Sequence, residues 1–421
     1  MIKVLWVCNV PNKQACDFLG INGINVGGWL TGLSKGFEQD SDVKLVYCFP
    51  GTKKQQSFKT KGVSYYSFYE PRRFGLETNK HSKIQDKQIR KIIELEKPDI
   101  IHMFGTEYLH SYVFLKNAKN IKVCCSIQGL LSPYSKHFLD LVPSNIYKKI
   151  NLSCLVKGTL FQQKKNMEKR AVFEQKTIKE CKYIIGRTEW DKRESFYLNP
   201  NRIYYKCNES LRDQFYKYEW RFTNCVKHRI FFSQASSPLK GFNVLIEALN
   251  ILKDKYPDIS VHVAGNNLLK KNGLINRLKY STYASYIDTL LSKYGLKKSI
   301  HFCGNLSEES MVNEYMCTNV YVSSSAMENS SNSVSEAMIL GVPVISSDVG
   351  GISSLVDDNT NGFLYNANSP LELSHCIEKV FGDDAIAVSL GLAARKKALI
   401  THDRSKNTNS LKEAYFNILN D

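Results

Sequence analysis

The stretch Val320–Ser346 reads VYVSSSAMENSSNSVSEAMILGVPVIS and decides the fold. Its first four residues, Val320–Ser323, are typical of a strand that is buried on both faces of a parallel sheet. A polar loop follows, and then an apolar run that Gly341 and Pro343 close in the way that helices close. A second apolar run starts at Val342. This succession predicts a βαβ unit, and ligands of such units bind outside the carboxyl ends of the strands.

The same alternation extends in both directions along the chain. Further strands are expected at Ile2–Cys8, Val43–Phe49, Ile100–Phe104, Val123–Ile127, Tyr183–Gly186, Arg229–Phe232, Ile259–Ala264 and Ile300–Cys303. Helices are expected at Lys83–Leu95, Lys164–Glu180, Phe242–Leu252, Ser307–Met316, Val334–Leu340 and Arg404–Leu419. This pattern predicts an α/β fold with two doubly wound sheets. Residues 199–227 are polar and poorly periodic, so we expect one domain at 1–200, a second at 201–403 and a final helix at 404–421.

Composition limits the class of protein. A chain of 421 residues with 43% hydrophobic content suffices for two domains with cores of their own. It contains no apolar run of 18 residues, and the start MIKVLWVCNV is expected to be a strand and not a signal peptide. The twelve cysteines include no CxxC pair, and several lie in apolar runs, which indicates buried thiols in a reducing compartment. We therefore expect a cytoplasmic protein without a zinc site.

The charge is strongly basic. The formal net charge is +17, which favours nucleic acid, anionic lipid or a phosphorylated substrate as partner. Lysines alternate with apolar residues in Tyr147–Lys176, a pattern that suits an anionic membrane surface, including the inner face of the plasma membrane. A solvated, lysine-coated helix explains the same segment equally well.

The loop of the opening stretch has the residue types of a phosphate or sugar site. Ser333 and Glu336 have capping-box spacing, so the helix is expected to start at about Ser333. Backbone N–H groups at the positive end of that helix suit a pyrophosphate or sugar hydroxyls. These groups belong to Asn329, Ser330, Ser331, Asn332 and Ser333. Glu328 adds a carboxylate eight residues before Glu336; the plainer alternatives are a solvated acid at 328 and a simple helix cap at 336.

Two further loops have similar features. Lys240 precedes Gly241 in IFFSQASSPLKGF, which follows the strand Arg229–Phe232 and opens a helix. Gly27 and Gly28 come before a helix of the first domain, where glycine lets the backbone approach a ligand closely. An exposed turn lysine and an ordinary Gly-Gly turn are the alternatives.

Together these blocks resemble the retaining GT-B glycosyltransferases of family 4, the group 1 glycosyl transferases of bacterial polysaccharide biosynthesis. The resemblance implies two facing Rossmann-like domains, with the last helix crossing back to the first. It implies that Glu328 contacts the donor sugar, Glu336 holds the nucleotide ribose, and Lys240 binds the pyrophosphate, which Gly27 and Gly28 face from the first domain.

The chain departs from the family pattern at two positions. Gln234 stands where the family has the arginine of the pyrophosphate grip, so another cation such as Arg187 or Arg212 is needed to compensate. Gln128 stands where a histidine often lies near the reacting sugar. Glu107 and His110 are then the candidates for positioning the acceptor, and Arg187 is expected on the same side of the site.

The predicted function is transfer of a sugar, with retention, from a UDP- or GDP-sugar to a hydroxyl of a glycan or lipid-linked acceptor. The process would be surface polysaccharide or glycolipid biosynthesis. No cofactor and no metal are expected, because Asp40 and Asp42 read as a turn and not as a metal motif. A nucleotide-sugar epimerase is the alternative enzyme. A basic nucleic-acid-binding protein is the other alternative, but no stacking-aromatic motif supports nucleic acid as a partner.

Overall fold

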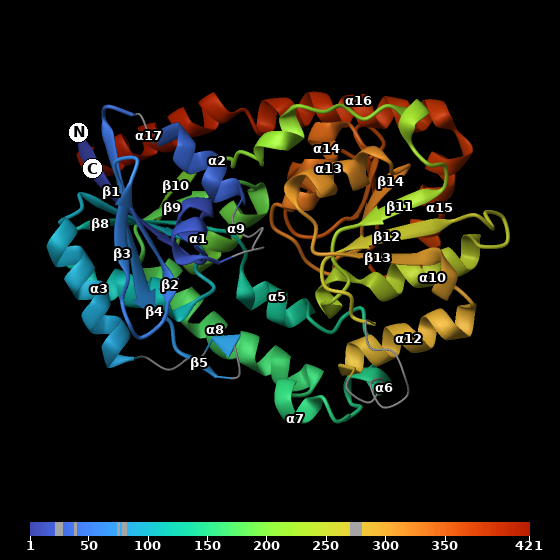
Figure 1. The fold of residues 1–421 in the computed structure, drawn as a ribbon, viewed down its shortest axis with the longest axis horizontal. Helices are drawn as coiled ribbons and strands as arrows, with labels where there is room; N and C mark the ends of the chain where they lie inside the picture. Colours follow the sequence, from blue (N-terminus) through green and yellow to red (C-terminus); the bar gives the residue numbers. More distant parts are fainter. Residues whose placement is uncertain (22–27, 38–39, 74–75, 78–81, 270–279) are drawn as a thin grey trace. The chain divides into compact units, whose positions relative to one another are not determined.

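The computed structural model describes residues 1–21, 28–37, 40–73, 76–77, 82–269 and 280–421, and it contains two compact units (Figure 1). The first unit comprises Met1–Ser132, Met167–Arg212 and His402–Asp421, and the second comprises Pro133–Asn166 and Asp213–Thr401. The expected limits of the folding domains, at residues 200 and 403, stay a prediction.

The first unit is built on an eight-stranded sheet with the order β10-β9-β8-β7-β1-β2-β4-β3. The strands are β1 (Ile2–Cys8), β2 (Val43–Gly51), β3 (Ser57–Thr60), β4 (Val63–Tyr69), β7 (Ile100–Phe104), β8 (Lys122–Ser126), β9 (Tyr183–Gly186) and β10 (Ile203–Lys206). All neighbours are parallel except β3, which is antiparallel to β4. A separate antiparallel pair is formed by β5 (Arg72–Arg73) and β6 (Leu76–Glu77). The central strands are buried on both faces, as their continuous apolar runs predict.

Helices pack on both faces of this sheet. They are α1 (Lys13–Leu19), α2 (Gly28–Phe37), α3 (Lys83–Glu96), α4 (Leu109–Asn117), α9 (Glu189–Leu198) and α17 (Arg404–Asn420), and α5 (Leu131–His137) and α8 (Leu160–Glu180) continue into the second unit. Figure 1 shows α2 beside α17. The last helix therefore completes the first unit, as the resemblance implied.

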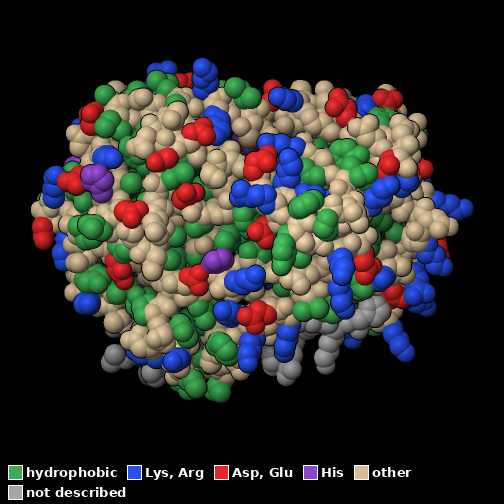
Figure 2. Space-filling model, turned by 180° about the vertical axis from the view of Figure 1, so that it is seen from behind, with side chains coloured by type: hydrophobic (Ala, Val, Ile, Leu, Met, Phe, Trp, Pro, Cys, Tyr) green, Lys and Arg blue, Asp and Glu red, His purple; other side chains and the backbone are tan. Residues whose placement is uncertain are grey.

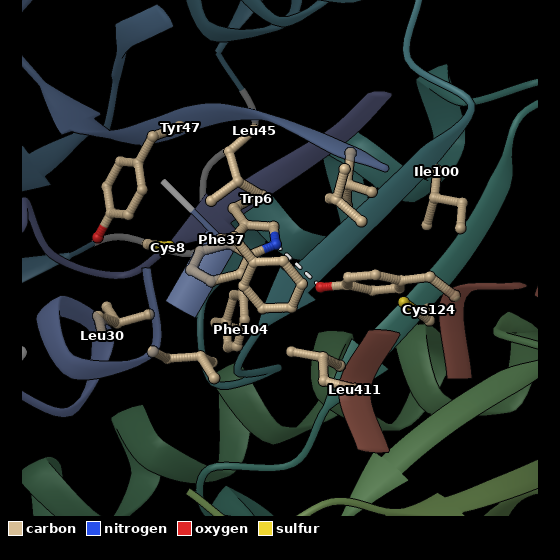
Figure 3. Packing of buried hydrophobic residues seen from close by; sticks show 14 of the residues in the cluster. Trp6, Cys8, Leu30, Phe37, Leu45, Tyr47, Ile100, Phe104, Cys124 and Leu411 are labelled. Atoms are coloured by element: carbon tan, nitrogen blue, oxygen red, sulfur yellow. Dashed lines mark hydrogen bonds between the residues drawn. The ribbon is translucent and has the colours of Figure 1, made fainter. Parts of the chain in front are cut away.

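The hydrophobic core under α2 and α17 is rich in aromatic rings (Figure 3). Trp6 of β1 packs edge-on against Phe37 of α2 and Phe104 of β7, with ring centroids 5.7 and 4.8 Å apart. The indole N–H of Trp6 donates to the hydroxyl of Tyr415 on α17 at 2.9 Å, and that hydroxyl lies 2.6 Å from Nδ1 of His102. A buried indole and phenol need such partners. The terminal helix is thus fixed by hydrogen bonds as well as by apolar contact.

The second unit has a six-stranded parallel sheet with the order β13-β12-β11-β14-β15-β16. Its strands are β11 (Arg229–Phe232), β12 (Ser260–Ala264), β13 (Ile300–Gly304), β14 (Val320–Ser323), β15 (Val344–Ser347) and β16 (Phe363–Tyr365). Its helices are α6 (Ser144–Tyr147), α7 (Cys154–Lys157), α10 (Phe242–Leu252), α12 (Thr282–Tyr294), α13 (Glu308–Met316), α14 (Asn332–Leu340), α15 (Pro370–Gly382) and α16 (Asp384–Thr401). Short 3-10 turns lie at Asp213–Tyr216, Phe222–Asn224, Pro238–Lys240, Lys297–Ser299 and Ile352–Ser354.

The strands expected from apolar runs are confirmed, with ends that differ by one or two residues. Four strands of the two sheets were not expected: β3, β4, β10 and β16. β3, β4 and β10 contain polar or tyrosine residues among their apolar ones, and β16 has only three residues. β10 also lies in the poorly periodic segment 199–227. Sheet pairing supplies the stabilisation that their local patterns do not reveal.

All twelve cysteines are free thiols and eight of them are buried, which agrees with the expectation from their apolar surroundings. Among the described residues, no helix is both long and apolar enough to cross a membrane.

Candidate functional site

The loops that carry the second-unit motifs leave the sheet at neighbouring strands. The chain passes from β11 to β12 on one side and reaches β14 on the other side of β11, so the strand order reverses at β11. Ligands of doubly wound sheets bind at such a reversal, outside the carboxyl ends of the strands. Lys240 lies in the loop after β11, and Glu328 lies in the loop after β14. The fold therefore brings together two motifs that are 88 residues apart.

Lys240 and Glu328 form a direct ion pair. The Nζ atom of Lys240 lies 2.5 Å from Oε1 of Glu328, and the Ser325 hydroxyl donates to the same oxygen at 2.8 Å. The Lys240 side chain is 30% exposed and the Glu328 side chain is 11% exposed. An ammonium group has three donors, so Lys240 can hold Glu328 and still donate to an anionic ligand.

The backbone beneath Lys240 is fixed by the loop after β14. Gly241 has φ of +63°, and a Cβ atom there would lie 1.9 Å from the carbonyl oxygen of Ser324. The Ser324 hydroxyl donates to the carbonyl oxygens of Lys240 and Gly241, at 3.1 and 2.8 Å. Only glycine combines this left-handed conformation with so close an approach. The glycine after Lys240 therefore serves the packing of two loops.

Glu328 is fixed by the loop after β15. The Gly351 N–H donates to the Glu328 carbonyl oxygen at 3.0 Å. Gly350 has φ of +55°, and a Cβ atom there would lie 2.0 Å from that oxygen. The Ser347 hydroxyl donates to the Ser325 carbonyl oxygen at 2.6 Å. The carboxylate is thus held on a rigid support.

Tyr321 of β14 connects the two motifs, although it belongs to neither of them in the sequence. Its buried hydroxyl lies 3.0 Å from the Ser233 hydroxyl, in the loop after β11. Burial, together with the charges of Glu328 and Glu336, raises the pKa of Tyr321 above its usual range. Both carboxylates therefore lie near one phenol. The only sequence signal was a tyrosine inside a buried strand, where its hydroxyl must find a partner.

The start of α14 differs from the predicted capping box. The helix begins at Asn332, its N-cap is Ser331, and no side chain caps it. Ser333 lies within the first turn, and its carbonyl oxygen accepts a hydrogen bond from Tyr315 at 2.9 Å. The capping-box prediction for Ser333 and Glu336 is therefore wrong, because the spacing alone did not show which serine precedes the first turn.

The loop before α14 is also more occupied than expected. The Asn329 N–H donates to the Tyr134 hydroxyl of α5 at 3.1 Å, so it is not available to a ligand in this arrangement. Ser330 is half-buried and Ser331 is buried, and Glu336 is 6% exposed on the first turns of α14. Glu336 lies on α14 in the second unit, and its expected ribose contact stays a prediction.

Gln234 is exposed, and its amide nitrogen lies 3.4 Å from the Ser236 hydroxyl. Arg187, one cation expected to compensate for it, is buried in the first unit and pairs with Glu209 at 2.6 Å. Arg187 therefore has a structural partner of its own, and its charge is already balanced.

Gln128 belongs to the same group of side chains in the first unit. Its side-chain amide nitrogen donates to Oε1 of Glu209 at 2.6 Å, and its backbone carbonyl oxygen accepts from Arg187 at 2.9 Å. The Glu209 carbonyl oxygen lies 2.7 Å from Nδ1 of His402. Gln128, Arg187 and Glu209 line one hollow beyond the ends of β8 and β9. Glu209 contacts Gln128, Arg187 and His402, and the sequence showed only that it lies within the polar segment 199–227.

Glu107 lies beyond β7, where the strand order of the first sheet reverses between β7 and β1. Its carboxylate accepts from the Gly129 N–H at 3.1 Å and from the Asn9 amide at 3.3 Å. Burial is the largest influence on its pKa, which is raised, and Arg170 acts in the opposite direction. Glu107 is therefore held at the edge of the sheet that carries ligands in this architecture.

His110 is fully buried behind Glu107. Its Nδ1 lies 2.8 Å from Oε2 of Glu70, and its Nε2 lies 3.0 Å from Oδ1 of Asn9. Since Asn9 also donates to Glu107, the histidine is linked to that carboxylate through one amide. The structure thus places His110 as a support for Asn9 and Glu107 and not at a surface.

Gly27 lies outside the described residues, and Gly28 is the first residue of α2. Asp40 and Asp42 lie 2.8 and 2.7 Å from the ammonium group of Lys412 on α17. Their carboxylates thus hold the last helix, a contact that the prediction of a simple turn did not include.

Comparisons with known proteins agree with this geometry. Residues 224–397 match the family model described as glycosyl transferases group 1, so the expected likeness to group 1 glycosyl transferases is confirmed for that segment. A D-inositol 3-phosphate glycosyltransferase of Streptomyces avermitilis is 25% identical over 175 residues, which is 40% of this chain and 35% of that protein. The match thus spans about a third of the relative's length.

Solved structures extend the likeness to the whole chain. Sucrose-phosphate synthase from Thermosynechococcus elongatus superposes with a TM-score of 0.69 at 13% identity, over 99% of both chains. Alr3699/HepE of Anabaena, solved in complex with UDP-glucose, gives a TM-score of 0.67 at 14% identity, over 99% of this chain and 100% of that one. At these identities the likeness establishes the fold. The chain has the GT-B fold, with two parallel-sheet α/β units and a C-terminal helix that returns to the first.

Proposed function

We propose that this protein is a retaining glycosyltransferase that moves a sugar from a nucleotide-sugar donor to an acceptor hydroxyl. The observation that carries the proposal is the ion pair between Lys240 and Glu328, held at the strand-order reversal of the second sheet. The segment that contains it resembles the group 1 glycosyl transferases. A cation and a carboxylate at one rigid point suit a ligand with both phosphates and sugar hydroxyls.

In this proposal Lys240 stabilises the departing diphosphate, and Glu328 orients the donor sugar. Negative charge on the leaving phosphate grows in the transition state, where a fixed cation contributes most. Glu336 accepts hydrogen bonds from the ribose hydroxyls, as carboxylates do in related nucleotide sites. Ser330, Ser331 and the first turn of α14 complete the donor side.

Retention follows from the residues proposed to act. A base on the far face of the sugar is needed only for inversion. Gln128 is no base, and its amide is already bonded to Glu209. The leaving phosphate then takes the acceptor proton on the near face. Neither a cofactor nor a metal takes part in this proposal.

The acceptor side is assigned to the first unit, with Glu107 as the contact. His110 contributes to positioning the acceptor indirectly, because it holds Asn9, which in turn holds Glu107. Arg187 and Gln128 act together with Glu209 as one support. We further propose a glycan or lipid-linked acceptor in surface polysaccharide or glycolipid biosynthesis, in the cytoplasm.

A basic apolar surface at residues 148–165 supports a peripheral position on the inner face of the plasma membrane. Its apolar members are Ile150, Leu152, Leu155 and Phe161, which are 79%, 59%, 83% and 49% exposed. Its lysines with described side chains are Lys148, Lys149, Lys164 and Lys165. Lys165 lies over the Phe161 ring, 4.8 Å from its centroid. Exposed apolar residues flanked by lysines suit an anionic lipid surface.

The two alternatives, a nucleotide-sugar epimerase and a nucleic-acid-binding protein, require different features. An epimerase would convert the nucleotide sugar without any acceptor. A nucleic-acid-binding protein would use a continuous basic surface, whereas Figure 2 shows Lys and Arg side chains spread over the drawn face with Asp and Glu among them.

The decisive experiment is a thermal-shift screen of UDP-, GDP- and other nucleotide sugars, followed by product analysis with and without acceptor. A true donor at ~100 times its Kd adds about 2.7 kcal/mol to the unfolding free energy. We expect one nucleotide class to raise Tm in the native protein and to act weakly on Glu336→Gln. A protein that responds to no nucleotide sugar, or that binds DNA with steep salt dependence, would refute the proposal.

A further inference from the structure

Three side chains with metal-binding atoms meet at the edge of the second sheet. His262 lies on β12, Cys303 on β13 and Glu314 on α13. One ligand atom from each lies within 4.8 Å of the other two. The Nδ1 atom of His262 is 2.7 Å from Oε2 of Glu314 and 3.9 Å from Sγ of Cys303. All three residues are half-buried, so an ion from solvent can reach them.

The sheet register turns Cys303 toward the histidine. β13 is the edge strand, and its Phe302 and Gly304 pair with consecutive residues of β12. Cys303 lies between these two pairs, where the register of the two strands shifts. It is two residues after His301, which pairs with His262, so the alternation of the strand puts Cys303 and His262 on one face of the sheet. The helix α13, which follows β13, then supplies the carboxylate.

We propose that His262, Cys303 and Glu314 bind a divalent zinc-class cation. An imidazole, a thiolate and a carboxylate are the donor types that Zn²⁺ accepts. Tetrahedral zinc with Zn–N of about 2.0 Å and Zn–S of about 2.3 Å places nitrogen and sulfur ~3.5 Å apart. The present 3.9 Å is close to that distance. The histidine–carboxylate hydrogen bond must open by less than ~1 Å, which rotation of the Glu314 carboxylate allows.

The charges at the site are compatible with a dication. Arg229 on the neighbouring strand β11 acts electrostatically on Glu314 and Cys303 and would repel a lone cation. A thiolate and a carboxylate together carry two negative charges. These balance the two positive charges of the ion, so the net charge that remains at the site is that of Arg229. The fourth position falls to water or to His301, whose ring centroid is 5.2 Å from that of His262.

The sequence could not reveal this group. No CxxC pair is present, and each ligand comes from a different element, so the spacing carries no metal signature. None of the three residues takes part in the proposed transfer reaction. The proposal therefore stands or falls independently of the donor site.

The test is a titration of the reduced, tag-free full chain with Co²⁺, followed by displacement with Zn²⁺. Thiolate-bound cobalt gives a charge-transfer band in the near ultraviolet. We expect a saturable band at one equivalent that Zn²⁺ removes. Cys303→Ser should lose the band, and His262→Gln should weaken cobalt binding about tenfold or more. Cys317→Ser, which changes another half-buried thiol of the second unit, should retain it.

A titration without the band, or a band that survives in Cys303→Ser, would overturn the proposal. A second measurement, made on the native chain, tests the proposal even if Cys303→Ser does not fold. Alkylation of the native chain, mapped by mass spectrometry, should be slowed by Zn²⁺ at Cys303 and unchanged at Cys317. Equal alkylation of Cys303 with and without Zn²⁺ would also overturn it.

Discussion

Removal of the Lys240 ammonium group tests the proposed site most directly. In Lys240→Ala the Glu328 carboxylate keeps the Ser325 hydroxyl as a partner at 2.8 Å, but it loses the cation at 2.5 Å. Because Lys240 is 30% exposed, solvent screens part of this interaction. We expect the unfolding free energy to fall by only about 1 kcal/mol or less. The variant should therefore fold.

The expected kinetic effect is larger. Loss of one fixed donor to a developing negative charge typically costs ~10²–10³ in kcat, or about 2.7–4 kcal/mol. A group that acts mainly on the leaving diphosphate lowers kcat more than it raises KM. Steady-state kinetics with the nucleotide sugar found by thermal shift measures both constants. Lys298→Ala, which removes an exposed lysine of the same unit, is the control and should retain wild-type constants.

A double-mutant cycle with Glu328→Gln then tests the pair itself. Residues in direct contact couple by ~0.5–3 kcal/mol, so the double variant should lose less than the sum of the single losses. Two results would refute the reasoning. One is an unchanged kcat with a raised KM in Lys240→Ala, which would limit Lys240 to ground-state binding. The other is additivity, which would mean that the two side chains act separately.

Four further predictions address other parts of the molecule. Glu336→Gln should lower nucleoside diphosphate affinity about tenfold or more, as measured by calorimetry, with an unchanged Tm; unaltered affinity in the folded variant would remove the ribose assignment. Lys→Glu changes at all four lysines of the 148–165 surface should abolish sedimentation with anionic vesicles, and equal binding to neutral vesicles would contradict the membrane proposal. Burial lowers the pKa of His402 to about 4, so between pH 6.5 and pH 4 the native state binds fewer protons than the unfolded state, and the unfolding free energy should decline over that range. Urea unfolding of His402→Gln should show a shallower decline with pH. An equal decline in the variant would argue against His402 as the cause. An α-linked donor should give an α-glycoside by NMR of the first product, with Gln128→Ala slower but active, whereas a β-product would exclude retention.

Much of the fold could be predicted because its signals are local. Continuous apolar runs at Ile2–Cys8 and Ile100–Phe104 indicated buried parallel strands, and both strands are present. The helix Arg404–Asn420 followed from its own periodicity. Tyrosine-rich strands such as β4 were missed, since their preference for a sheet depends on neighbours that the local sequence does not name. The N-cap of α14 was misplaced by two residues for a similar local reason, because Ser331 and Ser333 are both suitable N-cap residues.

The sequence by itself determined the succession of most strands and helices along the chain and the loops that carry Lys240 and Glu328. It also determined the resemblance from which the proposed roles of these two residues come. Only the tertiary structure decided which side chains touch. It paired Lys240 with Glu328, placed Tyr321 between the motifs, and joined Gln128 to Arg187 through Glu209. Such contacts join residues 22 to 88 positions apart. They depend on strand order and register, which arise from packing of the whole sheet and are not encoded in any local pattern.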